Sequence, residues 1–246
     1  LVTVLGLAAA STSSASSSAA STSFLSVSSS STTGFTFGSD DVFLSGANQP
    51  WIEYGSDFGN SQVNGLKCSL QDYIRNVSDS GGNSIRMWLF VEGATIPAFD
   101  SSGMVTATDA DGTLIDDLRA YLQYAASQNV FIHLMLWNGA LMREDSMMAL
   151  LSDTDKLQSF IENALTPMAK ALANEPGLGS WEIMNEPEGS VLIAADDEPC
   201  FDTKTTLENS GAGWSGAGIP MEQLLRFHNR QAAAIHAADP KALVTI

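Results

Sequence analysis

The chain has 246 residues, 44% of them hydrophobic, which is enough to bury the core of one large domain or two small ones. Its 28 acidic residues outnumber 11 Lys and Arg, and nucleic acids and anionic membranes would repel the resulting net charge of −17, so we expect neither as a partner. A neutral polymer such as a polysaccharide is compatible with this charge, although solubility alone would also explain it.

The N-terminal segment has the character of a secretory leader. Residues 1–10 are apolar and end in small side chains, as the core of a signal peptide does, and they are too few to span a bilayer, which needs about 20 residues. We therefore expect a partial signal peptide within residues 1–20 and a secreted, extracellular protein. Residues 11–34 consist mostly of Ser, Thr and Ala, which predicts a disordered linker, with the folded part beginning near Phe35.

Strand-like and helix-like segments alternate over the rest of the chain. Apolar runs predict five strands, at residues 42–47, 84–90, 130–137, 180–185 and 242–246. Apolar residues at helical spacing predict four helices, around residues 66–77, 114–125, 157–172 and 221–235. This alternation is typical of an α/β fold in which a parallel sheet is covered by helices.

Two α/β architectures compete for this pattern. A doubly wound fold would usually show a glycine-rich turn after an early strand, but the one such segment, residues 211–216, follows a polar stretch and is better interpreted as a flexible loop. A complete (β/α)8 TIM barrel takes about 250 residues. Here five strands already use the whole chain, which stops within an apolar run. We therefore expect a (β/α)8 TIM barrel truncated after about the fifth strand, with its first five βα units in residues 35–246.

The segment Trp-Glu-Ile-Met-Asn-Glu-Pro at residues 181–187 carries the strongest functional signal. Pro187 cannot continue a central strand, so the strand must stop at Glu186 and present its carboxyl group at the C-terminal edge, where α/β folds place their chemistry. Glu182 lies on the same face, but roughly 13 Å away along the backbone, which is too far for the carboxylate pair of a glycosidase. Glu182 is therefore predicted to be structural, and Glu92, after the second strand, is the only rival to Glu186.

The second strand carries an arginine among apolar residues. Alternation of faces directs Ile85, Met87 and Leu89 toward the helices, and Arg86 and Trp88 into the barrel. A guanidinium in that position needs carboxylate or carbonyl partners, and Glu182 is the predicted one. Arg86 could hold a catalytic carboxylate ionised and oriented, or form a purely structural ion pair.

Three tryptophans are predicted near the same edge of the sheet. Trp51 follows the first strand, Trp88 lies in the second and Trp137 ends the third. Their aromatic faces could stack on the C–H faces of sugar rings, although single tryptophans are more often core residues. Three amides lie close to the same edge and could bind hydroxyl groups: Asn48, Asn138 and Asn185.

The remaining chemistry-bearing residues predict no metal or cofactor site. His133 lies inside an apolar strand and is interpreted as a hydrogen-bonded core residue. His228 and His236 are too far apart along one helix to share a metal ion. Cys68 and Cys200 could pair with each other or with other partners, and the sequence does not decide between these.

Together these residues resemble a known family. Arg86 on the second strand and Asn185-Glu186-Pro187 at the end of the fourth resemble glycoside hydrolase family 5, the retaining (β/α)8 enzymes of clan A. Three blocks are similar to endo-β-1,4-mannanases of molluscs and arthropods within that family: residues 42–60 at and after the first strand, residues 85–90 and residues 181–189. The resemblance runs from about residue 40 to the end.

The resemblance implies roles for individual residues. Glu186 matches the acid/base, Asn185 the residue that binds the 2-hydroxyl of the sugar, and Arg86 the arginine that supports the nucleophile. The nucleophile itself is a glutamate at the end of a seventh strand, beyond the five predicted here. Many members have His before the asparagine that ends the third strand, where this chain has Trp137 before Asn138.

We accordingly expect a monomeric enzyme that needs no cofactor and cleaves β-mannan within the chain, with the nucleophile lying outside this sequence. Two alternatives stay open. One is a β-1,4-glucanase of the same family, and the other is a catalytically inactive barrel that only binds carbohydrate.

Overall fold

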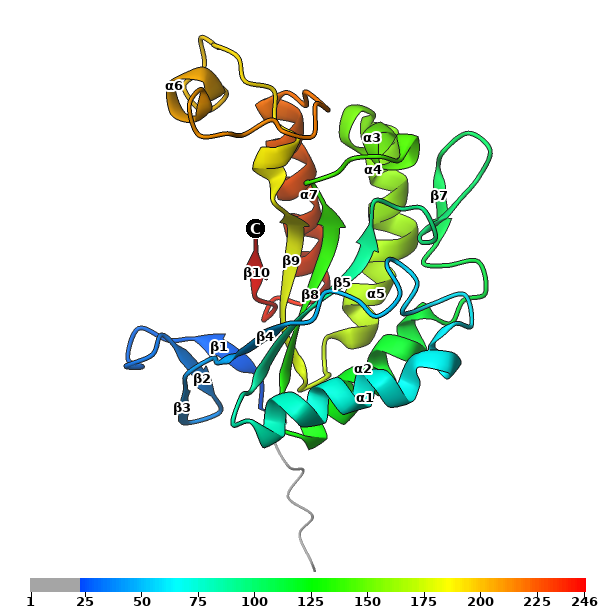
Figure 1. Cartoon of the computed structure of the whole chain (residues 1–246), viewed down its shortest axis with the longest axis vertical. Helices are drawn as coiled ribbons and strands as arrows, with labels where there is room; N and C mark the ends of the chain where they lie inside the picture. Colours follow the sequence, from blue (N-terminus) through cyan, green and yellow to red (C-terminus); the bar gives the residue numbers. More distant parts are fainter. Residues whose placement is uncertain (1–22) are drawn as a thin grey trace, which may run out of the picture.

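The computed structural model describes residues 23–246 and is built around one parallel sheet (Figure 1). Its strands lie in the order β10, β9, β8, β5, β4, and every neighbouring pair is parallel. Their bounds are Gly46–Asn48 for β4, Ser84–Val91 for β5, Phe131–Asn138 for β8, Leu178–Asn185 for β9 and Val244–Thr245 for β10. Successive strands are therefore neighbours, as in a (β/α)8 barrel, and the predicted parallel sheet is confirmed.

Helices connect these strands and pack around the outside of the sheet (Figure 1). Their bounds are Val63–Asp79 for α1, Leu114–Ser127 for α2, Asp145–Ser152 for α3, Thr154–Phe160 for α4, Thr166–Leu172 for α5 and Met221–Ala238 for α7. A π turn over Ile161–Leu165 joins α4 to α5. It lies just before Pro167, whose ring is incompatible with the regular helical hydrogen bond. All four predicted helices are present, and α3 was not predicted.

Short elements complete the connections. An antiparallel hairpin of β6 (Ala98–Phe99) and β7 (Val105–Ala107) precedes α2, the 3₁₀ turn Pro187–Gly189 follows β9, and α6 (Thr203–Leu207) lies between that turn and α7. None of the helices within residues 23–246 has the length and apolar character of a membrane span. Cys68 and Cys200 do not pair with each other, and both are free, exposed thiols.

An antiparallel sheet at the N-terminus corrects the linker prediction. β1 (Leu25–Val27), β2 (Phe35–Phe37) and β3 (Asp40–Val42) pair in that order, so the ordered part begins before Phe35. Leu25 is buried, and the ring of Phe37 meets that of Phe131 at 5.3 Å, at the N-terminal end of β8. A few apolar side chains thus suffice to dock a Ser- and Thr-rich segment. The predicted signal peptide and the linker up to residue 22 lie outside the described residues.

The core lies between the sheet and the helices. In β5, Ile85, Met87 and Leu89 are buried among the helices, whereas Arg86 and Trp88 are only partly buried on the opposite face, which confirms the predicted alternation. The alternation breaks near the strand ends, because Leu89 and Phe90 are both in the core and the register with β8 shifts between Trp88 and Val91. This break determines which side chains reach the candidate site.

Candidate active site

Side chains on the inner face of the sheet form rows across the strands, and several of them are polar. Asn48, Arg86 and His133 are register partners in β4, β5 and β8, and Trp88, Met135 and Glu182 form the next row toward the C-terminal ends. His133 Nδ1 lies 2.7 Å from Ser180 Oγ, which confirms that the histidine is hydrogen-bonded, but it lies partly buried on this inner face and not in the core. Burial lowers the pKa of His133, although the charge of Glu182 acts in the opposite direction. His133 is therefore expected to be neutral near pH 7.

Arg86 is the centre of the polar cluster on this face. Its Nε donates to Glu182 Oε2 at 2.7 Å, and Nη2 donates to the other oxygen of the same carboxylate. The predicted ion pair is thus confirmed, in the paired geometry that suits a guanidinium and a carboxylate. Arg86 also donates to Asn48 Oδ1 at 3.3 Å and, through Nη2, to Asn185 Oδ1 at 2.9 Å. The arginine therefore connects a structural carboxylate to the end of β9.

Asn185 continues this connection toward β8 and β5. Its Nδ2 donates to Asn138 Oδ1 at 3.1 Å, and Asn138 Nδ2 donates to Glu92 Oε1 at 2.7 Å. Tyr54 Oη donates to the same Glu92 oxygen at 2.5 Å. We call this chain of hydrogen bonds, from Glu182 through Arg86, Asn185 and Asn138 to Glu92, the amide relay. Each asparagine accepts from one neighbour and donates to the other, so the relay fixes the orientation of both amides.

Glu92 forms the far end of the relay and is not placed as a rival to Glu186. Its side chain is buried, with the residue 4% exposed, and two donors occupy one of its oxygens. Burial, followed by the neighbouring Glu92 carboxylate, raises the pKa of Tyr54, so the phenol keeps its proton and donates. The sequence placed Glu92 after the second strand but gave no signal for its contact with Asn138, which is distant in sequence.

Glu186 projects from the rim directly after β9. The strand ends at Asn185, and Glu186 takes the left-handed conformation, with φ 48° and ψ 55°, before the 3₁₀ turn that begins at Pro187. Such a backbone costs a non-glycine residue of the order of 1–3 kcal/mol and is often found at functional sites. The Gly189 N–H bonds to the Glu186 carbonyl at 3.0 Å and stabilises this turn. The side chain of Glu186 is exposed.

Close packing of β8 on β9 holds this turn in place. The Gly139 N–H donates to the Asn185 carbonyl at 2.8 Å. A Cβ atom at residue 139 would lie 2.9 Å from the Glu186 carbonyl oxygen and 3.0 Å from that of Asn185. Only glycine therefore allows the end of β8 to approach the Asn185–Glu186 backbone so closely.

An aromatic wall of Trp51, Tyr54 and Trp88 borders the relay on the side of β4 and β5. The Trp51 ring lies 4.9 Å from that of Tyr54 and 5.1 Å from that of Trp88, both edge-to-face, and the Arg86 guanidinium lies 5.5 Å from the Trp88 ring centre. Buried Asp57 accepts the backbone N–H groups of the two residues after Trp51, at 2.9 and 2.7 Å, and so shapes this loop. Trp51 and Trp88 are thus placed where the sequence predicts sugar contact.

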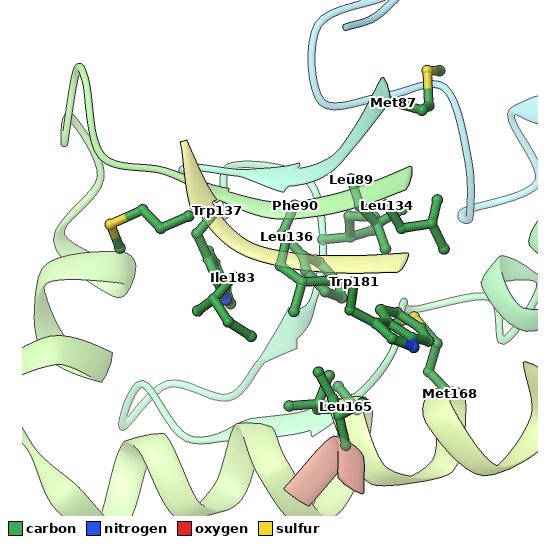
Figure 2. Close-up of a cluster of buried hydrophobic side chains, with 14 of the residues drawn as sticks. Met87, Leu89, Phe90, Leu134, Leu136, Trp137, Leu165, Met168, Trp181 and Ile183 are labelled. Atoms are coloured by element: carbon green, nitrogen blue, oxygen red, sulfur yellow. The ribbon is translucent and has the colours of Figure 1, made fainter. Parts of the chain in front are cut away.

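Trp137 corrects the third tryptophan prediction. It is fully buried on the helix side of the sheet, in the same cluster as Phe90 (Figure 2). Its ring also packs against those of Phe160 and Phe227. Its Nε1 donates to Gln231 Oε1 at 3.0 Å. The alternation of faces breaks between Leu136 and Trp137, which are both core residues, so simple alternation assigns the indole to the wrong side. Trp137 cannot contact a sugar at the strand ends.

The same break places Asn138 and Asn185 at the candidate site. Strict alternation puts Met184 on the face of Glu182 and Asn185 on the other, but Met184 lies in the core and the Asn185 amide meets Arg86. The structure therefore gathers Glu186, Asn185, Arg86 and Asn138 at one strand edge, with Trp51 and Trp88 beside them. Within residues 23–246 no group of three or more His, Cys, Asp or Glu could hold a metal ion.

The comparisons with known proteins agree on one family. Residues 45–246 match the Cellulase family (glycosyl hydrolase family 5). The mannan endo-1,4-β-mannosidase of Cryptopygus antarcticus is 50% identical over 216 residues, covering 88% of this chain and 56% of that protein. The enzyme of the same name from Mytilus edulis is 46% identical over 219 residues, covering 88% and 59%.

A solved structure gives the same result. The crystal structure of the β-1,4-D-mannanase from Cryptopygus antarcticus superposes with a TM-score of 0.86 at 50% identity, covering 90% of this chain and 60% of that one. The chain thus spans between 56% and 60% of the length of these two relatives and of the solved structure.

Proposed function

Because the chain belongs to glycosyl hydrolase family 5, we propose that the full-length gene product hydrolyses β-1,4-mannosidic linkages within mannan chains and retains the anomeric configuration. The observation that carries the proposal is the placement of Glu186, which is exposed at the end of β9 on a rigid turn and directly follows an asparagine fixed by the amide relay. The two relatives named as mannan endo-1,4-β-mannosidases support mannan as the substrate.

Glu186 acts as the acid and then as the base in this proposal. It protonates the glycosidic oxygen as the leaving sugar departs, and it later removes a proton from the water that cleaves the glycosyl–enzyme bond. The attacking carboxylate must lie about 5–5.5 Å from Glu186, across the sugar. Glu182 is bound by Arg86, and Glu92 by Tyr54 and Asn138. The family resemblance assigns the nucleophile to a later strand of the barrel.

Asn185 and Arg86 prepare the site for the reacting sugar. The side-chain oxygen of Asn185, Oδ1, accepts from Arg86, and one N–H of its side-chain amide donates to Asn138. The second N–H of that amide is left for a sugar hydroxyl. We assign that hydroxyl to the 2-position, which differs between mannose and glucose. Arg86 places the positive charge of a guanidinium at the centre of the inner face of the sheet, next to Asn185.

The test uses the full-length gene product and mannan. We expect release of oligosaccharides whose new reducing ends first appear in the β configuration, as followed by proton NMR. Glu186→Ala should lower mannan hydrolysis by about 10²–10⁴-fold, because it removes the proton donor. The same substitution should slow formation of the glycosyl–enzyme far less when the substrate is an aryl β-mannoside with an activated leaving group. Added azide should restore the second step, in which the glycosyl–enzyme is broken down.

Glu188→Ala is the matched control, because Glu188 is also exposed and lies two residues further on the same turn. It should keep near-normal activity. Normal mannan turnover by Glu186→Ala would refute the assignment of the acid/base. Faster cleavage of a β-1,4-glucan than of mannan would favour the glucanase alternative, and binding of mannan without cleavage would favour an inactive barrel.

A further inference from the structure

Asn76 lies in a triplet that can accept an N-linked oligosaccharide. The triplet is Asn76-Val77-Ser78, and no other asparagine among the 246 residues is followed two positions later by Ser or Thr. Triplets of this kind are common by chance. Whether this one can be a modification site therefore depends on where the fold places it.

The asparagine faces outward from α1. Leu70 and Ile74 are buried on the side of the helix that packs toward the sheet. At about 100° per residue, Asn76 lies about 160° around the helix axis from Ile74, and its side chain is exposed. It belongs to a stripe of exposed residues at helical spacing, which consists of Gly65, Ser69, Asp72, Asn76 and Asp79.

This stripe suits a bulky modification because nothing in the barrel architecture has to cover it. The helices of a (β/α)8 barrel form its outer ring, so that neighbouring helices pack on the flanks of each helix and the outward side meets solvent. Figure 1 shows α1 on the outside of the sheet. Asn76 also lies near the end of α1 that leads into Ser84, at the N-terminal end of β5. Glu186 lies at the opposite edge of the sheet, so an oligosaccharide on Asn76 leaves the candidate active site open.

We propose that Asn76 carries an N-linked oligosaccharide, added in the secretory pathway of a eukaryotic cell. The proposal rests on the secretion expected from residues 1–10 and does not depend on the hydrolysis of mannan. In the reaction, the side-chain nitrogen of Asn76 bonds to the anomeric carbon of an oligosaccharide carried on a lipid diphosphate. The bond between that carbon and the diphosphate oxygen breaks, the lipid diphosphate leaves with the electron pair, and a base of the transferase takes the proton that the amide loses.

Ser78 limits when this reaction can occur. Its Oγ donates to the Gln128 carbonyl at 2.9 Å, in a partly buried contact between the ends of α1 and α2. The helix also turns the side chains of Asn76 and Ser78 about 160° apart. Because the triplet is recognised through both side chains together, the folded helix is a poor substrate. The oligosaccharide is therefore added before α1 docks on α2.

The experiment uses the full-length gene product with its natural N-terminus, made in cultured eukaryotic cells. Peptide N-glycosidase removes an N-linked oligosaccharide and converts the asparagine that carried it to aspartate. Mass spectrometry of the peptides should therefore find aspartate at residue 76 after this treatment, and an oligosaccharide-bearing asparagine before it. Unmodified asparagine at residue 76 of the secreted protein, or a product found only in the cytosol, would overturn the proposal.

Matched variants assign the oligosaccharide to the triplet. Asn76→Gln removes the acceptor but keeps the contact between Ser78 and Gln128, and should lower the mass of the intact protein by one oligosaccharide. Ser78→Thr keeps the triplet and a hydroxyl group and should keep the oligosaccharide, as should Asn209→Gln, which changes an exposed asparagine outside any such triplet. An intact mass that does not fall in Asn76→Gln would contradict the assignment.

The order of events has a separate test. Microsomes opened with detergent supply the transferase and its lipid-linked donor, and the acceptor is full-length gene product made in bacteria. Chain freshly diluted from urea should accept the oligosaccharide at Asn76, whereas the folded protein should not. Equal transfer to both would show that the contact of Ser78 with Gln128 does not protect the triplet.

Discussion

Replacing Asn138 by Asp tests whether the amide relay has the orientation described. Asn138 Nδ2 donates to Glu92 Oε1 at 2.7 Å, while Asn138 Oδ1 accepts from Asn185 at 3.1 Å. Aspartate has almost the same shape, keeps the second contact and replaces the first donor by an oxygen. The variant therefore places two carboxylate oxygens in contact in a largely buried site.

The expected loss of stability is set by whichever costs less free energy, keeping both carboxylates charged or binding one proton between them. Two unit charges 2.7 Å apart repel by about 6 kcal/mol at an effective dielectric constant of about 20. The pair can instead share one proton. Because carboxylic acids ordinarily titrate near pKa 4, holding that proton at pH 7 costs about 4 kcal/mol. Proton uptake is cheaper, so Asn138→Asp should lose about 4 kcal/mol of stability at pH 7.

The pH dependence identifies the cause. The folded pair has a raised pKa, so the variant is as stable as the parent below pH 4 and loses about 1.4 kcal/mol for each pH unit above it. Urea unfolding of the full-length gene product between pH 4 and pH 7 measures this slope. Asn209→Asp, at an exposed position, is the matched control and should show none of it. Equal stability of Asn138→Asp and the parent at pH 7, or a loss independent of pH, would refute the described orientation.

Two further predictions concern stability. Trp137→Phe should lower the free energy of unfolding, measured with urea, by about 1–3 kcal/mol, because the buried Gln231 loses its donor. It should leave hydrolysis per folded molecule unchanged. A selective loss of activity would contradict the placement of Trp137 in the core, away from the substrate. Burial raises the pKa of Asp109, but hydrogen bonds, including those from Thr113 and Leu114, lower it overall. Asp109→Asn should therefore cost about 1.5–3 kcal/mol at pH 7 and progressively less as pH falls below 3.8; thermal unfolding at pH 7 and pH 3 tests this, and an equal loss at both would contradict it.

Local sequence patterns predicted the residues that depend on one strand. Arg86 is recognisable because a guanidinium inside an apolar run needs a partner, and Glu182 is the carboxylate with matching alternation. Glu186 is recognisable because Pro187 ends the strand after it. These predictions use only the two-residue period and the chemistry of one side chain. The two-residue period does not predict the break in alternation near the strand ends, where Trp137 and Met184 face the helices instead.

Contacts between distant segments could not be predicted in this way. Tyr54 and Asn138 both donate to one oxygen of Glu92, although Tyr54 lies in the connection after β4, Glu92 follows β5 and Asn138 ends β8. Trp214 lies in a glycine-rich loop that has no periodic pattern. Its position depends on one glycine, Gly189, in a turn on the other side of a long connection. Such sites follow from tertiary packing, and only the three-dimensional arrangement reveals them.

The direction of the amide relay has a consequence for sugar binding. The side-chain oxygen of Asn185 accepts from the cation Arg86, which draws electron density from the side-chain amide and makes its N–H groups better donors. At the other end, Glu92 accepts from Asn138, which makes the Asn138 oxygen a better acceptor for Asn185. A flipped Asn185 would face Arg86 with its own N–H groups and face Asn138 with its oxygen, two repulsive contacts. The guanidinium of Arg86 on one side of the two amides and the carboxylate of Glu92 on the other therefore hold both amides in one orientation. The Asn185 N–H that the proposed function assigns to a sugar hydroxyl is then a strengthened donor before any substrate arrives.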